Sequence, residues 1–321
     1  MNKQPIPDLD KLGLDPEVVQ ALKPRLTLTF GAELDVSYTT LQSTGNYLRC
    51  SLEQGEEVAL RAALDELKLD PGQEPPLVEC WLPLRDVRLS RGMAGDPASN
   101  GMVDGQLVEH CAAKARTAAA DVSPGWAGTR LWGDIAEIAI DGVTLPKPVL
   151  DAPMPGDNLR VEVLEAFYHP EVEAARTNML KSCGLPTPAF LHLTCTSRAE
   201  AFTTQHERQE GIAVLWLDPF GVEITVSHGG HVVALTDFPA PHADPTPQLF
   251  EASAWLQREG WSPKRLPHGI RLLGRGLERA WLDRIRAKTP LTVTLPDAPE
   301  IDQSLAQDLL RNSMLGSRQL R

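Results

Sequence analysis

The second half of the chain places apolar segments and glycines in an order that few folds accommodate. Ala213–Leu217 (AVLWL) is an uninterrupted apolar run, which is typical of a strand buried on both faces. Strands expected at 222–226 and 232–235 flank Gly229-Gly230, and glycines accept the positive φ values of a two-residue hairpin turn. Helical spacing and short apolar runs then alternate towards residue 295. Strands and helices therefore follow one another in a specific order in this half of the chain.

Other elements follow from periodicity and turn residues. Residues 90–105 are rich in Gly, Ser, Asn and Asp, and we expect them to form a mobile loop. Residues 146–157 contain four prolines and are expected to connect two subdomains. The remaining strands are expected at 26–30, 33–41, 46–52, 77–82, 135–145 (a hairpin around Asp141-Gly142), 159–167, 269–273 and 291–295. The helices are expected at 56–67, 106–120, 171–183, 249–259, 277–288 and 304–314.

Charge and cysteine content exclude several classes of function. The 321 residues carry a net charge of −12, which repels a polyanion, so we expect no nucleic-acid partner. The five cysteines are an odd number without a C-x-x-C pair and are expected to be reduced and buried. No apolar run approaches the roughly 18–20 residues of a membrane span, and Met1–Leu14 is too polar for a signal peptide. We therefore expect a cytosolic protein.

Four short motifs carry a resemblance to a known family. They are Lys181–Leu185 (KSCGL) at a helix end, Asp218–Gly221 after the apolar strand, Gly229-Gly230 in the hairpin, and Leu272–Gly276 (LLGRG). Their order resembles the actin-like superfamily, and within it the PilM- and GspL-type assembly proteins of type IV pili and type II secretion. The early half adds Thr29-Phe30-Gly31 and the segment 82–91.

The resemblance implies an α/β fold with mixed sheets and a two-lobed, ribonuclease H-like architecture. Residues 1–24 would be a lead-in. Residues 25–158 would form the first lobe, with an inserted subdomain at about 80–135. Residues 159–321 would form the second lobe and end in a helix.

The resemblance also implies a nucleotide cleft, lined here by Gly31, Asp218, Gly221, Gly274 and Gly276. The chain departs from a working site at two turns. Thr29 stands where the first aspartate should be, and the second turn contains Pro219, which lacks an N–H donor, and the bulky Phe220. We therefore expect no cofactor and no catalysis, as in a pseudo-ATPase. The alternative is an ATPase or kinase that binds ATP and Mg²⁺ near Asp218. All these turns are also compatible with ordinary connections.

A partner groove in the inserted subdomain is the other implied site. The family likeness implies binding of the N-terminal cytoplasmic segment of a single-span inner-membrane protein, which would hold this chain at the inner membrane. Self-association into a homo-oligomer stays open. The candidate groove residues are Trp81, Leu82, Arg85, Val87, Arg88 and Leu89. The apolar residues among them fit a core equally well, and the arginines fit an edge strand that resists aggregation. Without the resemblance, the chain would be a two-domain α+β adaptor.

Metal and nucleophile chemistry find little support in the sequence. His228 and His231 flank the hairpin glycines, and His242 and Asp237 are the nearest further donors. Histidines on an exposed hairpin are usually solvated, so we expect no metal. No G-x-S-x-G or H-E-x-x-H pattern occurs, and the cysteines at helical positions, such as Cys111, fit core positions.

Overall fold

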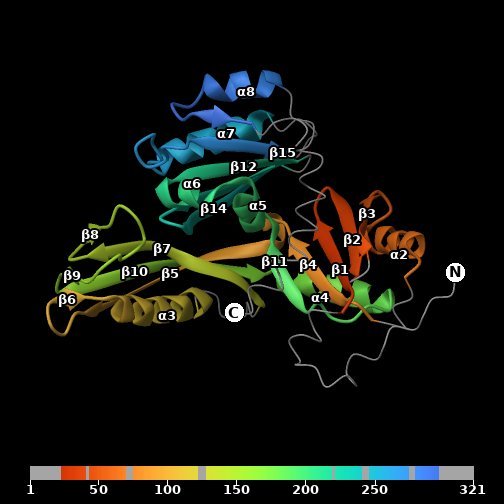
Figure 1. The fold of residues 1–321 in the computed structure, drawn as a ribbon, viewed down its shortest axis with the longest axis horizontal. Coiled ribbons are helices and arrows are strands. Elements are labelled where there is room, and N and C mark those ends of the chain that lie inside the picture. Colours follow the sequence, from red (N-terminus) through yellow and green to blue (C-terminus); the bar gives the residue numbers. More distant parts are fainter. Residues whose placement is uncertain are drawn as a thin grey trace. The chain divides into compact units, whose positions relative to one another are not determined.

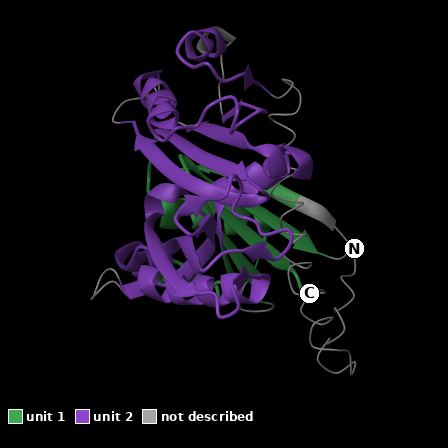
Figure 2. Ribbon diagram, turned by 90° about the vertical axis from the view of Figure 1, so that its left-hand side faces the viewer, with its two compact units in different colours: residues 1–80, 177–191, 306–321 green, residues 81–176, 192–305 purple. Residues whose placement is uncertain are grey.

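The computed structural model describes residues 23–40, 43–69, 75–121, 128–218, 221–240, 246–274 and 279–295 (Figure 1). The chain divides into two compact units (Figure 2). Unit 1 holds the described residues up to Cys80 together with 177–191, and unit 2 holds 81–176 together with the described residues from His192 onwards. The expected lead-in up to residue 22 and the expected helix at 304–314 lie outside the described residues.

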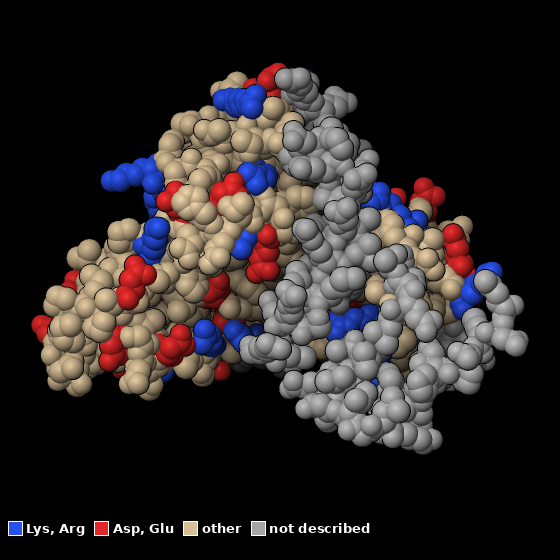
Figure 3. Space-filling model, in the orientation of Figure 1, with Lys and Arg blue, Asp and Glu red and all other residues tan. Residues whose placement is uncertain are grey.

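Surface charges of both signs are interspersed on the face shown in Figure 3. Among the described residues on that face, Lys and Arg side chains lie next to Asp and Glu side chains and form no extended patch of one sign.

Unit 1 is built on a five-stranded sheet of order β11-β4-β1-β2-β3. Its antiparallel pairs β1–β2 and β2–β3 follow one another along the chain, and α2 packs against β2 and β3. Leu26, Leu28 and Phe30 alternate along β1 and are fully buried, as a strand with one apolar face requires. The elements that lie wholly in this unit are β1 (Arg25–Phe30), β2 (Glu33–Thr40), β3 (Ser43–Ser51) and α2 (Glu56–Leu67). The boundary between the units falls within β4 (Leu77–Leu82), α4 (Pro170–Ser182) and β11 (Phe190–Leu193).

Unit 2 begins with an antiparallel sheet of order β5-β10-β7-β8, one face of which α3 covers (Figure 1). Val108, Cys111 and Ala115 of α3 pack on Val161 and Val163 of β10. The elements are η2 (Leu84–Asp86), β5 (Val87–Pro97), β6 (Met102–Val103), α3 (Gly105–Asp121), β7 (Arg130–Ile140), β8 (Val143–Thr144), β9 (Met154–Pro155) and β10 (Asn158–Tyr168). The hairpin expected around Asp141-Gly142 is confirmed.

The loop expected at 90–105 is wrong, because residues 90–97 belong to strand β5, Met102–Val103 form strand β6 and Gly105 begins helix α3. The glycines of β5 allow neighbouring elements to pack closely against this strand. A Cβ built on Gly92 would lie 2.6 Å from Ala119 N and closer still to the carbonyl oxygen of Ala115. Gly92 therefore allows the backbone of α3 to approach β5, which is a tertiary reason that local composition does not reveal.

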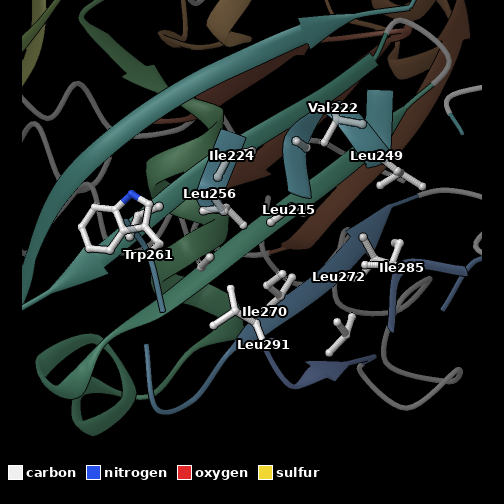
Figure 4. Packing of buried hydrophobic residues seen from close by; sticks show 14 of the residues in the cluster. Leu215, Val222, Ile224, Leu249, Leu256, Trp261, Ile270, Leu272, Ile285 and Leu291 are labelled. Carbon is white, nitrogen blue, oxygen red and sulfur yellow. The ribbon is translucent and has the colours of Figure 1, made fainter. Parts of the chain in front are cut away.

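The second sheet of unit 2 has the order β14-β13-β12-β15-β16. β12, β13 and β14 are antiparallel, whereas β15 runs parallel to β12, and their apolar faces form the core shown in Figure 4. The hairpin with Gly229-Gly230 at its tip is confirmed. The elements are α5 (Thr194–Phe202), α6 (Gln205–Glu210), β12 (Ile212–Asp218), β13 (Gly221–His228), β14 (His231–Pro239), α7 (Thr246–Arg258), β15 (Ile270–Gly274), α8 (Arg279–Arg286) and β16 (Val293–Thr294).

Most elements expected from periodicity are present, and the missed helices are short. The helix expected at 56–67 is confirmed residue for residue, as is the strand at 77–82. Helices α5 and α6 and strand β11 were not expected. Helix α6 buries no residue and therefore has no apolar stripe, and two of the four residues that α5 buries are threonines. The cysteines are free, but Cys50 is half-buried, whereas the other four are buried as expected.

Candidate functional site

The first turn of the predicted nucleotide cleft belongs to unit 1. Gly31 connects β1 and β2, and a Cβ at this position would meet only the carbonyl oxygen of Glu33, at an ordinary 3.6 Å. The backbone here therefore does not demand glycine. Thr29, which replaces the expected aspartate, is 4% exposed, and its hydroxyl finds no hydrogen-bond partner within the described part of the chain.

The second and third turns belong to unit 2, and the sheet itself explains their glycines. Gly221 has a φ of 145°, and a Cβ there would lie 3.0 Å from Ala240 N and closer to the carbonyl oxygen of Phe238. Gly274 has a φ of 148°, and its Cβ would crowd Leu217. Both positions require glycine because neighbouring strands approach closely. They give no independent evidence of a phosphate site.

The remaining residues of the predicted cleft give little further evidence on nucleotide binding. The side chain of Asp218 and the whole of Gly276 lie outside what the structure describes. The hairpin-tip N–H groups are already engaged, since Gly229 donates to the carbonyl of Gln209 and Gly230 to that of Arg208. Binding of a nucleotide by these residues stays a prediction.

One face of the unit 1 sheet is polar although it is buried, a feature that sequence reasoning missed. Arg25 donates to Glu79 at 2.6 Å, and both side chains are almost fully buried. Burial raises the pKa of the Glu79 carboxyl to about 7, and the Arg25 charge opposes this rise. The sequence predicted strands at 26–30 and 33–41 but gave no sign that their polar residues are buried. The buried polar residues on this face are Arg25, Thr27, Thr29, Asp35, Ser37 and Glu79.

The predicted partner-binding residues fall into two groups. Trp81 and Leu82 are buried, and Trp81 stacks on His192 with ring centroids 4.2 Å apart. Val87 and Leu89 of β5 pack partly against a cluster that includes Leu235 of β14. These four residues therefore offer little free surface in this conformation, and their contact with a partner stays a prediction. Of the predicted arginines, Arg85 lies in η2 and Arg88 in β5.

Strand β5 forms an outer edge of its four-stranded sheet. Among the described strands it pairs with β10 alone in that sheet. Beyond Leu89, the face opposite α3 presents Arg91 and then Met93, whose side chain is 52% exposed. Arg91 pairs with Glu162 of β10. The exposed half of β5 thus combines an open strand edge, an apolar side chain and a compensated charge, which suits an extended peptide.

An ion pair connects the two sheets of unit 2. Asp134 of β7 hydrogen-bonds Nδ1 of His231 at 2.6 Å and accepts the backbone N–H of Val232 at 2.9 Å. The hydrogen bond with Asp134 raises the pKa of His231. His228, expected on an exposed hairpin, is instead 6% exposed, and burial lowers the pKa of its imidazole. His242, the other expected donor, lies outside the described residues.

A pH dependence follows from the raised pKa of His231. The folded pKa lies above the unfolded value of about 6.5, so the stabilisation is complete below about pH 6.5 and is lost as the pH rises through the folded pKa. We expect the stability of the wild type to fall more than that of Asp134→Asn between about pH 6 and pH 9. Urea unfolding of both proteins at several pH values measures this difference. Parallel pH profiles would contradict the assignment.

Comparison with known proteins bears on the fold. No family model and no curated protein matches the chain. Among solved structures, a chain of the PilM–PilN type IV pilus biogenesis complex aligns with a TM-score of 0.51 and 13% identity, covering 90% of this chain and 98% of that one. A Bacteroides thetaiotaomicron protein of actin-like ATPase fold and unknown function aligns at 0.48 with 8% identity, covering 93% and 99%.

A third similar structure is the cytoplasmic domain of EpsL, an inner-membrane component of the type II secretion system of Vibrio cholerae. It aligns with a TM-score of 0.44 and 14% identity, and the match covers 92% of this chain and 95% of that domain. The chain shares the fold of the chain from the PilM–PilN complex, and the expected actin-like α/β fold is thereby confirmed. None of the described helices has the length and apolar composition needed to cross a membrane.

Proposed function

We propose that the chain is a scaffold of a type IV pilus or type II secretion assembly platform, where it binds a short cytoplasmic segment of a single-span membrane protein. The open edge of β5 carries this proposal. The fold shared with a chain of the PilM–PilN complex supports the class of machine. In this proposal the partner brings the scaffold to the cytoplasmic face of the inner membrane.

The peptide would join β5 as an additional strand. Main-chain hydrogen bonds along the edge supply affinity without regard to sequence, and side-chain contacts supply specificity. Met93 offers an apolar contact at the centre of β5. Strand β5 suits an extended peptide better than a helix, because an edge strand offers a row of main-chain hydrogen-bonding groups that only an extended chain can pair with.

The proposed role needs no hydrolysis of ATP. The glycines at 221 and 274 are required by strand packing, and Thr29 provides no carboxylate for Mg²⁺. An actin-like ATPase or kinase is the competing function. It would show phosphate release that depends on Mg-ATP and is lost in Asp218→Ala.

A binding experiment separates the two functions. The tagged chain is purified from detergent-solubilised membranes of its native host, and any co-purified single-span protein is identified. The cytoplasmic segment of that protein is then synthesised and titrated into the pure chain by calorimetry. We expect binding of one peptide per chain, with and without Mg-ATP. A single-span protein whose cytoplasmic segment does not bind directly would contradict the scaffold.

Met93→Asp tests where the peptide binds. A bound peptide would cover this position and remove water from the aspartate carboxylate, so we expect the affinity to fall by at least about tenfold. Met154→Asp is the matched control, because Met154 is also an exposed methionine, at 40% against 52% for Met93, but lies in β9. Equal affinities for the two variants would place the peptide elsewhere.

A further inference from the structure

Two histidines and a glutamate of unit 2 converge on the surface outside the regions described above. His206 and Glu210 lie one turn apart in α6, and His268 lies in the turn before β15. Nε2 of His268 is 3.3 Å from Oε2 of Glu210, and Nε2 of His206 is 3.7 Å from the same oxygen. One ligand atom from each residue lies within 4.8 Å of the others. We propose that these three residues bind a zinc ion.

The spacing agrees with the geometry of zinc. Zinc binds imidazole nitrogen and carboxylate oxygen at about 2.0–2.2 Å in a tetrahedral arrangement, so neighbouring ligand atoms lie about 3.3 Å apart. The Glu210–His268 distance already has this value. The side chain of His206 is 71% exposed and therefore free to rotate by the small amount that its longer distance requires. Three protein ligands leave a fourth position for water.

The backbone holds the three residues in place before any ion binds. A capping box between Thr204 and Glu207 fixes the start of α6. Glu207 also pairs with Arg271 of β15 at 2.7 Å. His268 donates its backbone N–H to the carbonyl of Gly211, the residue directly after Glu210. This contact holds the turn that bears His268 against the end of α6, so little ordering is required on binding.

The donor set selects the class of metal. Imidazole nitrogen favours zinc, copper and nickel, whereas magnesium and calcium prefer oxygen ligands alone. Sequence reasoning missed the site because His268 is far from α6 in sequence. The other histidine pair, His228 and His231, does not compete, since His228 is buried and His231 is held by Asp134. Zinc would join α6 to the start of β15 and so would stabilise the second sheet of unit 2.

Calorimetry with zinc chloride on the full chain, stripped with EDTA, tests the proposal. We expect one zinc ion at this site per chain, no competition by magnesium, and a rise in unfolding temperature of about 5 °C at a zinc concentration about 100 times Kd. His206→Ala and His268→Ala should each weaken zinc binding by at least about tenfold. His206 is exposed, so its variant should fold normally.

His110→Ala is the matched control. His110 is exposed and lies 3.4 Å from Asp96, so it also pairs with a carboxylate, but no second histidine lies beside it in the described structure. Its loss should leave the zinc affinity unchanged. Absence of zinc binding, or zinc binding that survives both the His206 and the His268 variants, would overturn the proposal. Circular dichroism of each variant shows whether it keeps the wild-type fold, so that a loss of zinc binding can be separated from unfolding.

Discussion

Replacing Arg130 with methionine is expected to lower the free energy of unfolding of unit 2 by about 3–5 kcal/mol. Glu165 of β10 is fully buried, and the Arg130 guanidinium donates two hydrogen bonds to its carboxylate. Arg116 of α3 contributes a longer contact of 3.6 Å. Gly133 makes room for the carboxylate, since a Cβ there would collide with it. Without Arg130, a buried negative charge would keep only the weaker of its two cationic neighbours.

Two further variants make this prediction specific. Arg91→Met removes a pair from the same sheet whose arginine is about as exposed as Arg130, at 51% against 50%. Its carboxylate partner Glu162 keeps 16% exposure, whereas Glu165 is fully buried, so we expect a loss below about 1 kcal/mol. Arg130→Met combined with Glu165→Leu should recover much of the stability, because no buried charge is left unpaired. Urea unfolding followed by tryptophan fluorescence measures all three. Equal losses for the two single variants would contradict the assigned role of Glu165.

Gly92→Ala is expected to destabilise unit 2 by about 2–3 kcal/mol. The added methyl group would meet backbone atoms of Ala115 and Ala119, and backbone inside a helix cannot rotate away as a flexible side chain can. Helix α3 would have to move off β5. That shift would also stretch the hydrogen bond from the Ser90 hydroxyl to the carbonyl of Ala119, which is 2.8 Å long.

Gly105→Ala provides the control for this substitution. Gly105 begins the same helix, and no atom lies within 4 Å of a Cβ built there. We expect unchanged or slightly increased stability, since alanine favours a helix over glycine by up to about 1 kcal/mol. Thermal unfolding of both variants gives the comparison. A Gly92→Ala protein as stable as the wild type would show that α3 and β5 are not in close contact.

The sequence predicted elements wherever local periodicity decides the structure. The hairpin at Gly229-Gly230 and the buried strand β12 follow from residues that are adjacent in the chain. Strand β5 could not be found in this way, because Gly92 and Gly95 resemble a loop unless α3 and β10 are known to press against them. The sequence also predicted a solvated His228, because the segments that lie near its side chain, those of Gly211 and Arg265, are distant in the chain.

The candidate sites show the same limit. A glycine that lets a phosphate approach the backbone cannot be distinguished in sequence from a glycine that lets a neighbouring strand approach. At Gly221 and Gly274 the structure shows the close approach of a neighbouring strand. An apolar strand residue that contacts a partner also cannot be distinguished in sequence from one that fills a core. Leu82, which was predicted to bind a partner, is fully buried. The zinc ligands lie on two segments far apart in the chain, so no spacing in the sequence connects them.

Amide hydrogen exchange of the full chain, with and without the partner peptide, tests the proposed scaffold most directly. Strand addition should slow exchange along 87–97, because amides at the open edge of β5 would gain main-chain acceptors. Mg-ATP alone should leave the exchange pattern unchanged. Slower exchange around Gly31 and Gly221 with Mg-ATP, and none along β5 with the peptide, would contradict the scaffold and favour a nucleotide-dependent enzyme.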